Sequence, residues 1–183
     1  IQALYNVVDS MFVSYISEAA LTAVSLAYPM QNLMIAVATG TGVGVNALLS
    51  RNLGEKNYSM ANRVAGNAIF LGLVSYVVFA LLGLLGSRFY FSVQVEDPNI
   101  IALGHDYLSI VTVLSIGCFG QVLLSRLLQS TGKTFYSMVI QMVGAGLNLV
   151  LDPIMIFGLL GFPKMGVSGA ALATVISQLA GTA

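Results

Sequence analysis

Residues 64–87, VAGNAIFLGLVSYVVFALLGLLGS, form an unbroken apolar stretch with no charged residue between Arg63 and Arg88. A helix of about 20 apolar residues crosses the roughly 30 Å hydrocarbon core of a bilayer, so this stretch predicts a transmembrane helix. The rest of the 183-residue chain has the same character, because 57% of its residues are apolar and 8% are charged. Soluble domains carry about 25% charged residues. The sequence therefore predicts an all-α integral membrane protein.

The few charged residues divide the remaining chain into further apolar segments of similar length. We expect about six spans, at residues 1–16, 21–49, 60–85, 101–125, 136–160 and 167–183. The chain starts and ends inside apolar stretches and does not begin with Met, so we interpret the first and last spans as truncated. Together the six spans would form one transmembrane bundle covering residues 1–183.

Composition also argues against several classes of function. Seven basic and seven acidic residues balance, which leaves no electrostatic case for binding nucleic acid. Cys118 is the one cysteine and His105 the one histidine, so neither a disulfide framework nor a Cys/His metal site is expected. No catalytic constellation is present in the sequence, and we expect neither an enzyme nor a bound cofactor.

The basic residues indicate an orientation in the membrane. Two alternate loops hold five of them, whereas the loops between hold only Arg88 and Lys164. Loops rich in Lys and Arg stay on the cytoplasmic side. We therefore expect a multi-pass protein of the plasma (inner) membrane, with its cytoplasmic loops marked by Arg51, Lys56, Arg63, Arg126 and Lys133.

Two carboxylates fall inside predicted spans, Asp9 in the first and Asp152 in the fifth. An acid at the centre of a span costs about 2.5–3.5 kcal/mol on the insertion scale and normally marks an ion or substrate pathway. Tyr5 and Asn148 each precede an acid by four residues, so each pair shares a helix face. Pro153 removes a backbone donor beside Asp152 and frees carbonyl oxygen there.

Other polar and flexible side chains recur in the spans. For the amides the simplest interpretation is hydrogen bonding between helices, worth roughly 0.6 kcal/mol each; they are Gln31, Asn32, Asn46, Asn67, Gln121 and Gln141. Methionines adapt to varied ligands but are common in ordinary packing; those inside the spans include Met30, Met34, Met138 and Met142.

Several short pieces, in this order and spacing, resemble the multidrug and toxic compound extrusion (MATE) transporters over the whole chain. They are YNVVD at 5–9, GTGVG at 40–44 leading into LGEKN at 53–57, LQSTGKT at 128–134, NLVLDP at 148–153 with IFG at 156–158, and GVSGAALAT at 166–174. Each piece alone is weakly specific, and NLVLDP with its continuation is the most specific of them.

The resemblance implies a twelve-helix protein of two six-helix bundles, of which this chain is the first. It also implies secondary active multidrug efflux, in which organic cations and amphipathic drugs leave in exchange for protons or sodium. The expected partners are then small, mostly cationic drugs, membrane lipid and the second six-helix bundle.

By the same resemblance Asp9, Asn148 and Asp152 form the ion-coupling site and part of the substrate cavity, with Tyr5 and Thr174 as polar partners. Two carboxylates in a weakly polar cavity cannot both ionise at low cost, so such a pair can load and release a proton. The same oxygen-rich group could hold Na⁺ at Asp9, Asn148 and Asp152, and the sequence leaves the coupling ion open.

Two alternatives to an exporter remain. A lipid-intermediate flippase of the same superfamily is expected to line its cavity with basic residues, whereas both charges in the middle of spans here are acidic. A channel is expected to show a re-entrant filter or a ring of charge, and the sequence contains neither pattern. A scaffold membrane protein without transport activity is grouped with the channel as the second alternative.

Overall fold

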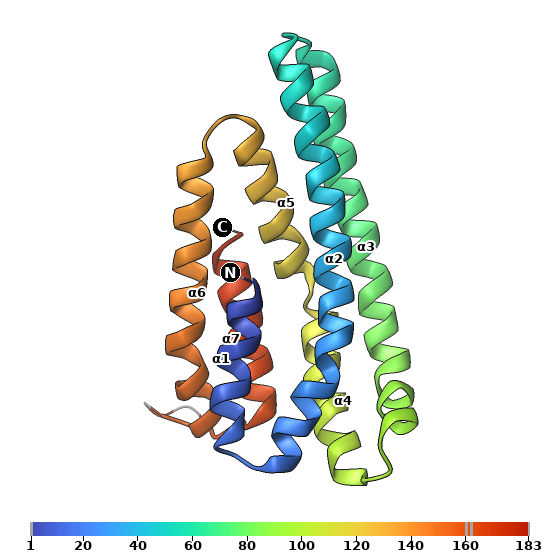
Figure 1. The fold of residues 1–183 in the computed structure, drawn as a ribbon, viewed down its shortest axis with the longest axis vertical. Coiled ribbons are helices and arrows are strands. Elements are labelled where there is room, and N and C mark those ends of the chain that lie inside the picture. The colour runs from blue at the N-terminus through green and yellow to red at the C-terminus, as the bar shows by residue number, and fades with distance from the viewer. Residues whose placement is uncertain (1, 160, 162, 183) are drawn as a thin grey trace.

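The computed structural model describes residues 2–159, 161 and 163–182, and within these the side chains from residue 7 onward. Every regular element in that part of the chain is an α-helix (Figure 1), which confirms the predicted all-α class. The helices are α1 (Gln2–Ser14), α2 (Glu18–Gly54), α3 (Tyr58–Gln94), α4 (Pro98–Val113), α5 (Ile116–Ser130), α6 (Thr134–Phe157) and α7 (Val167–Ala180).

The helices lie over the predicted apolar segments with one difference. Where one helix was expected at 101–125, the chain forms α4 and α5, which meet at an angle of 42°. The break occurs because the Ser115 N–H bonds to the carbonyl of Thr112, three residues back, before the four-residue pattern resumes at Phe119. Three of the described helices, α2, α3 and α6, are each long and apolar enough to cross a membrane. The pair α4 and α5 is long and apolar enough if the two are counted as one bent span. The number of six spans stays a prediction.

Polar residues at the loops determine where the helices begin. The side chains of Ser17, Asn57 and Asp97 each accept a hydrogen bond from a backbone N–H in the first turn of α2, α3 and α4. Such caps satisfy N–H groups that have no partner inside the helix. Gly158 follows α6 in the left-handed conformation, with φ 73°, which glycine adopts without steric cost.

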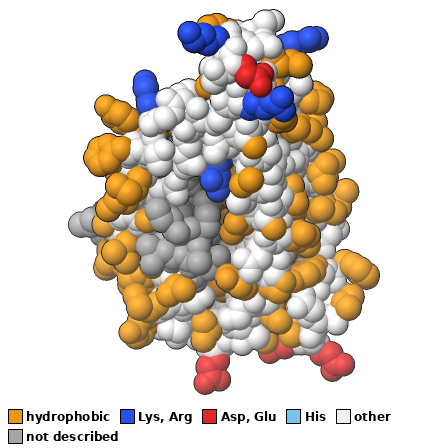
Figure 2. Space-filling view, turned by 45° about the horizontal axis from the view of Figure 1, so that its top comes forward, with side chains coloured by type: hydrophobic (Ala, Val, Ile, Leu, Met, Phe, Trp, Pro, Cys, Tyr) orange, Lys and Arg blue, Asp and Glu red, His pale blue; other side chains and the backbone are white. Residues whose placement is uncertain are grey.

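The helical hairpin of α2 and α3 extends beyond the rest of the bundle (Figure 1). Each of its helices has 37 residues, or about 55 Å at 1.5 Å per residue, which exceeds the hydrocarbon thickness. The α2–α3 and α5–α6 turns lie at the same end of the molecule. Lys and Arg side chains gather toward this end in Figure 2, where an acidic side chain lies among them, and further acidic side chains lie at the opposite end. We refer to the first as the basic end.

Small residues bring the helices close together around a core that includes Phe91, Tyr107 and Ala170. Among the described glycines, the closest approach to the backbone of another helix is at Gly169 in α7. A methyl group added there would lie 2.5 Å from the Met155 carbonyl oxygen of α6. Close approach through glycine is the usual way for membrane helices to pack. Because Asn148 and Thr174 belong to these same two helices, this contact also sets the geometry of the site described below.

We expect Gly169→Ala to lower the melting temperature of the full-length protein by several degrees. The added methyl meets backbone that cannot rotate away, and overpacking of this kind costs about 1–3 kcal/mol. Gly146→Ala in α6 is the matched control, because nothing lies within 4 Å of a methyl group there. Thermal unfolding of both purified variants in one detergent measures the difference. Equal melting temperatures would show that the α6–α7 contact is looser than described.

Candidate functional site

The two carboxyl groups of the predicted spans meet inside the bundle, together with polar side chains from three further helices. Asp9 comes from α1 and Asp152 from α6. All members of this group are buried. We call it the carboxyl cluster; its other members are Gln31 of α2, Tyr107 of α4, Asn148 of α6 and Thr174 of α7.

Asp9 accepts hydrogen bonds from two hydroxyl groups. The Tyr107 hydroxyl donates to Asp9 Oδ2 at 2.8 Å, and Thr174 Oγ1 lies 3.1 Å from Oδ1 and 3.0 Å from Oδ2. Since a threonine hydroxyl carries one proton, Thr174 shares it between the two oxygens. The Gln31 amide in turn donates to the Tyr107 hydroxyl at 3.0 Å, which orients the tyrosine proton toward Asp9.

Asp152 is less completely satisfied than Asp9. Asn148 Nδ2 donates to Asp152 Oδ1 at 3.1 Å and also lies 3.4 Å from Thr174 Oγ1, so it connects the two halves of the cluster. Asp152 Oδ2 is buried, and no donor among the described residues reaches it. Pro153 lacks an N–H, so the Leu149 carbonyl one turn earlier also loses its helical partner.

Asp9 and Asp152 are connected through two side chains: Thr174 bonds to Asp9, and Asn148 reaches both Thr174 and Asp152. Two bare carboxylates at this position would each need a cation, because burying an unpaired charge is costly. A proton on one acid, or a small hard cation bound by oxygen, is the kind of positive charge that would lower this cost.

The structure brings four of the five predicted site residues together: Asp9, Asn148, Asp152 and Thr174. Asn148 and Asp152 share a face of α6, as their spacing predicts. The fifth, Tyr5, has a side chain outside the described ones.

The sequence did not single out Tyr107, which contacts Asp9 directly. The residues four positions before and after it, Leu103 and Val111, are apolar. Helical spacing therefore did not pair Tyr107 with another polar side chain. Gln31 was predicted only as an amide that bonds between helices, and its bond from α2 to Tyr107 in α4 is of that kind. The other amides bond within their own helix or to no described partner; Gln141, for example, donates to Ser137 one turn away.

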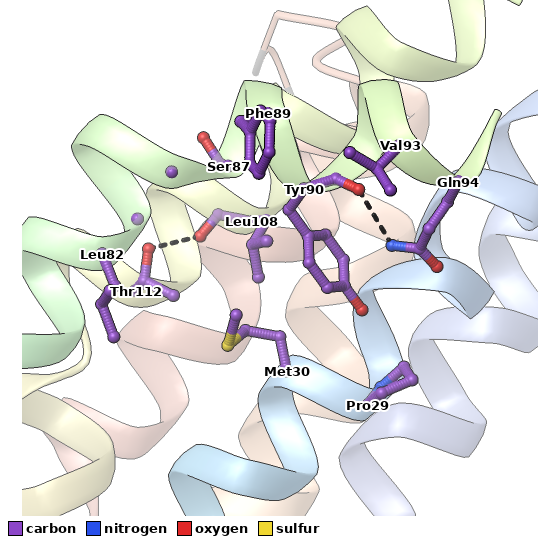
Figure 3. A pocket seen from close by; sticks show the side chains of 12 residues that line it. Pro29, Met30, Leu82, Ser87, Phe89, Tyr90, Val93, Gln94, Leu108 and Thr112 are labelled. Atoms are coloured by element: carbon purple, nitrogen blue, oxygen red, sulfur yellow. Dashed lines mark hydrogen bonds between the residues drawn. The ribbon is translucent and has the colours of Figure 1, made fainter. Parts of the chain in front are cut away.

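A mostly apolar cavity of about 540 Å³ lies away from the carboxyl cluster, between α2, α3 and α4 (Figure 3). Met30, Leu82 and Tyr90 line it, and the described residues around it include no charged side chain. The Tyr90 hydroxyl donates to the Leu26 carbonyl at 2.9 Å, which ties α3 to α2 beside the cavity. Of the other methionines named in the predicted spans, Met34 is buried, whereas Met138 and Met142 are exposed on the surface of α6.

Comparison with known proteins identifies relatives along the whole chain. The MatE family model matches residues 1–154. An FAD transporter of Shewanella oneidensis is 32% identical over 185 residues, covering 96% of this chain and 39% of that protein. A probable multidrug resistance protein, NorM, of Thermotoga maritima is 28% identical and covers 99% of this chain and 39% of its own length.

A solved structure shows the same architecture. The inward-facing conformation of a multidrug resistance MATE transporter of the MOP superfamily superimposes with a TM-score of 0.92 at 28% identity, covering all of this chain and 40% of that one. The chain thus spans about two-fifths of the length of the relatives it matches. The family match covers most of the chain and agrees with the fold and the apolar helices. The chain therefore belongs to the MatE family of multi-pass membrane transporters, which are not enzymes.

Proposed function

We propose that the protein is a secondary active multidrug exporter in which the carboxyl cluster couples drug efflux to ion entry. The carboxyl cluster carries this proposal, because two buried acids held by four polar side chains serve no obvious purpose in packing alone. An intramembrane acid normally marks an ion or substrate pathway. Organic cations and amphipathic drugs are the proposed substrates, with a second six-helix bundle completing the transporter.

We favour the proton over sodium as the coupling ion. Asn148 points its Nδ2 donor, not its oxygen, at both Asp152 and Thr174. A sodium ion at this place would need the amide turned so that its oxygen faces the ion, together with a full shell of oxygen ligands. A proton needs only a carboxyl group of the cluster to accept it. Its arrival from outside would favour one state of the transporter and drug binding the other, as alternating access requires.

Efflux measured in membrane vesicles tests the proposal directly. The full-length protein, expressed in cells lacking other exporters, is expected to move a fluorescent organic cation when a pH gradient is imposed without a sodium gradient. Vesicles carrying no protein, or with the gradient collapsed by an ionophore, are expected to show no movement. Transport that continues at full rate after both gradients are collapsed would contradict secondary active export.

A second substrate class has support from one relative. The Shewanella oneidensis protein is named an FAD transporter, and it is 32% identical to this chain. We therefore add export of an anionic nucleotide-type molecule as the alternative, to be assayed with FAD in the same vesicles. A flippase is less favoured, because the two charges at the centre of the bundle are carboxyl groups.

The basic end is proposed to face the cytoplasm. After Cys118, which is buried, is replaced by Ala, single cysteines at Lys56 or Lys133 are expected to resist an impermeant thiol reagent in intact cells. A cysteine at Glu96 or Lys164 is expected to react. Labelling after permeabilisation controls for accessibility of the cytoplasmic positions. The reverse pattern in intact cells would overturn the orientation.

A further inference from the structure

A polar cavity of about 170 Å³ lies between α2, α5 and α6, toward the basic end. Unlike the larger cavity beside α3, it is lined mostly by polar side chains. We call it the arginine cavity; its polar lining residues are Thr39, Gln121, Ser125, Arg126, Gln129 and Gln141. Along α6, Gln141 precedes Asp152 by eleven residues, roughly 16 Å at 1.5 Å per residue, so this cavity is separate from the carboxyl cluster.

Arg126 differs from every other basic residue of the chain. All seven Lys and Arg side chains are described, and Arg126 is the one that is partly buried, while six are exposed. Its guanidinium donates to Gln129 Oε1 at 3.1 Å and pairs with no carboxylate among the described residues. A guanidinium carries five N–H donors, so most of them are left for another partner. Gly42 makes room for the arginine stem, since a methyl group there would lie 2.9 Å from Arg126 Cγ.

Gln121 is the second unusual group in the arginine cavity. Its side chain is 1% exposed, yet neither its amide oxygen nor its amide nitrogen has a hydrogen-bond partner among the described residues. Leaving a buried polar group unpaired costs about 1–3 kcal/mol, so such groups usually face a ligand or ordered water. Gly181 gives the amide its space, because a methyl group there would lie 2.6 Å from Gln121 Nε2.

A hydrogen-bonded frame holds the walls of the cavity in place. Gln129 of α5 donates to Ser137 Oγ of α6 at 2.9 Å, and Gln141 donates to the same oxygen at 3.3 Å. Gln129 also accepts the bond from Arg126, so the guanidinium is fixed to both helices. A site whose donors are already positioned loses less entropy when a ligand binds.

The chemistry of these groups selects an oxyanion. A partly buried guanidinium repels cations and matches the paired oxygens of phosphate, while the free N–H groups of Gln121 add a neutral donor. We propose that the arginine cavity binds a phosphate group, carried either by a soluble organic phosphate or by a lipid headgroup at the same end. This site is distinct from the ion-coupling site and does not depend on the export function.

Binding of inorganic pyrophosphate to the full-length protein in phosphatidylcholine nanodiscs tests the site by calorimetry. We expect saturable binding to the wild type and at least a tenfold weaker affinity in Arg126→Gln. Gln121→Leu, which keeps the volume but removes the donor, is expected to weaken binding several-fold. Lys133→Gln is the matched control, since Lys133 is exposed at the same end, and its affinity should be unchanged. The melting temperature of each variant verifies folding, and Arg126→Lys retains the charge if Arg126→Gln fails to fold.

Two further measurements assign the ligand and separate this proposal from the export mechanism. In nanodiscs containing phosphatidylglycerol, a weaker apparent affinity for pyrophosphate would assign the site to a lipid headgroup, and an unchanged affinity to a soluble phosphate. Asp9→Asn is expected to bind pyrophosphate normally even where it no longer transports. No saturable binding to the wild type, or an equal loss in Lys133→Gln, would overturn the proposal.

Discussion

Replacing Asp152 by Asn in the full-length protein is expected to abolish gradient-driven efflux while the protein still reaches the membrane. The amide has almost the shape of the carboxyl group, but it cannot take up and release a proton. Asp152 Oδ2 is buried and lacks a described donor, which is why we propose that the arriving cation binds there. We expect efflux to fall to the level of vesicles without protein, a loss of at least a hundredfold.

Asp9→Asn is expected to give the same loss by a slightly different route. Asp9 accepts bonds from Tyr107 and Thr174, and an amide in its place presents one oxygen where there were two. Asp106→Asn in α4 is the matched control, because Asp106 is an exposed acid, and its efflux should equal that of the wild type. Surface expression is measured for all three variants. Wild-type efflux in either Asp9→Asn or Asp152→Asn would show that coupling takes place elsewhere in the protein.

Asn148→Leu is expected to distinguish proton from sodium coupling. Its amide is the one group that contacts both Asp152 and Thr174, so leucine removes this connection without touching either carboxyl group. If protons drive transport, Asn148 only adjusts how readily the acids take a proton. The variant should then keep part of its pH-driven efflux and show an altered pH optimum, with a rate several-fold below wild type.

The measurement imposes one gradient at a time on vesicles containing wild type or Asn148→Leu. With a sodium cage, the amide oxygen would be a direct ligand, and leucine should eliminate sodium-driven efflux almost completely. Asn67→Leu in α3 provides a control amide, since Asn67 is exposed and outside the cluster. Efflux driven by a sodium gradient at fixed pH in the wild type, and lost in Asn148→Leu, would prove the preference for the proton wrong.

The sequence by itself determined the class of the protein and the approximate positions of its helices. A shortage of charge is a property of composition, and the length needed to cross a bilayer turns each charge-free stretch into a predicted helix. The burial of Asp9 and Asp152 inside the bundle was also predictable, because an acid that faces hydrocarbon is costly wherever the helix lies. The Asn148–Asp152 pair followed from helical spacing alone.

Only the tertiary structure decided which of these side chains meet. Tyr107 and Asp9 are 98 residues apart, and Thr174 and Asp9 are 165 apart, so no periodicity within one helix relates them. The break between α4 and α5 likewise depends on a local change of hydrogen bonding at Ser115 that hydropathy does not report. Partial burial of Arg126 beside the amide of Gln121, which has no partner among the described residues, came from the packing of α2, α5 and α6. Burial and pairing depend on how helices pack, whereas hydropathy records each helix separately.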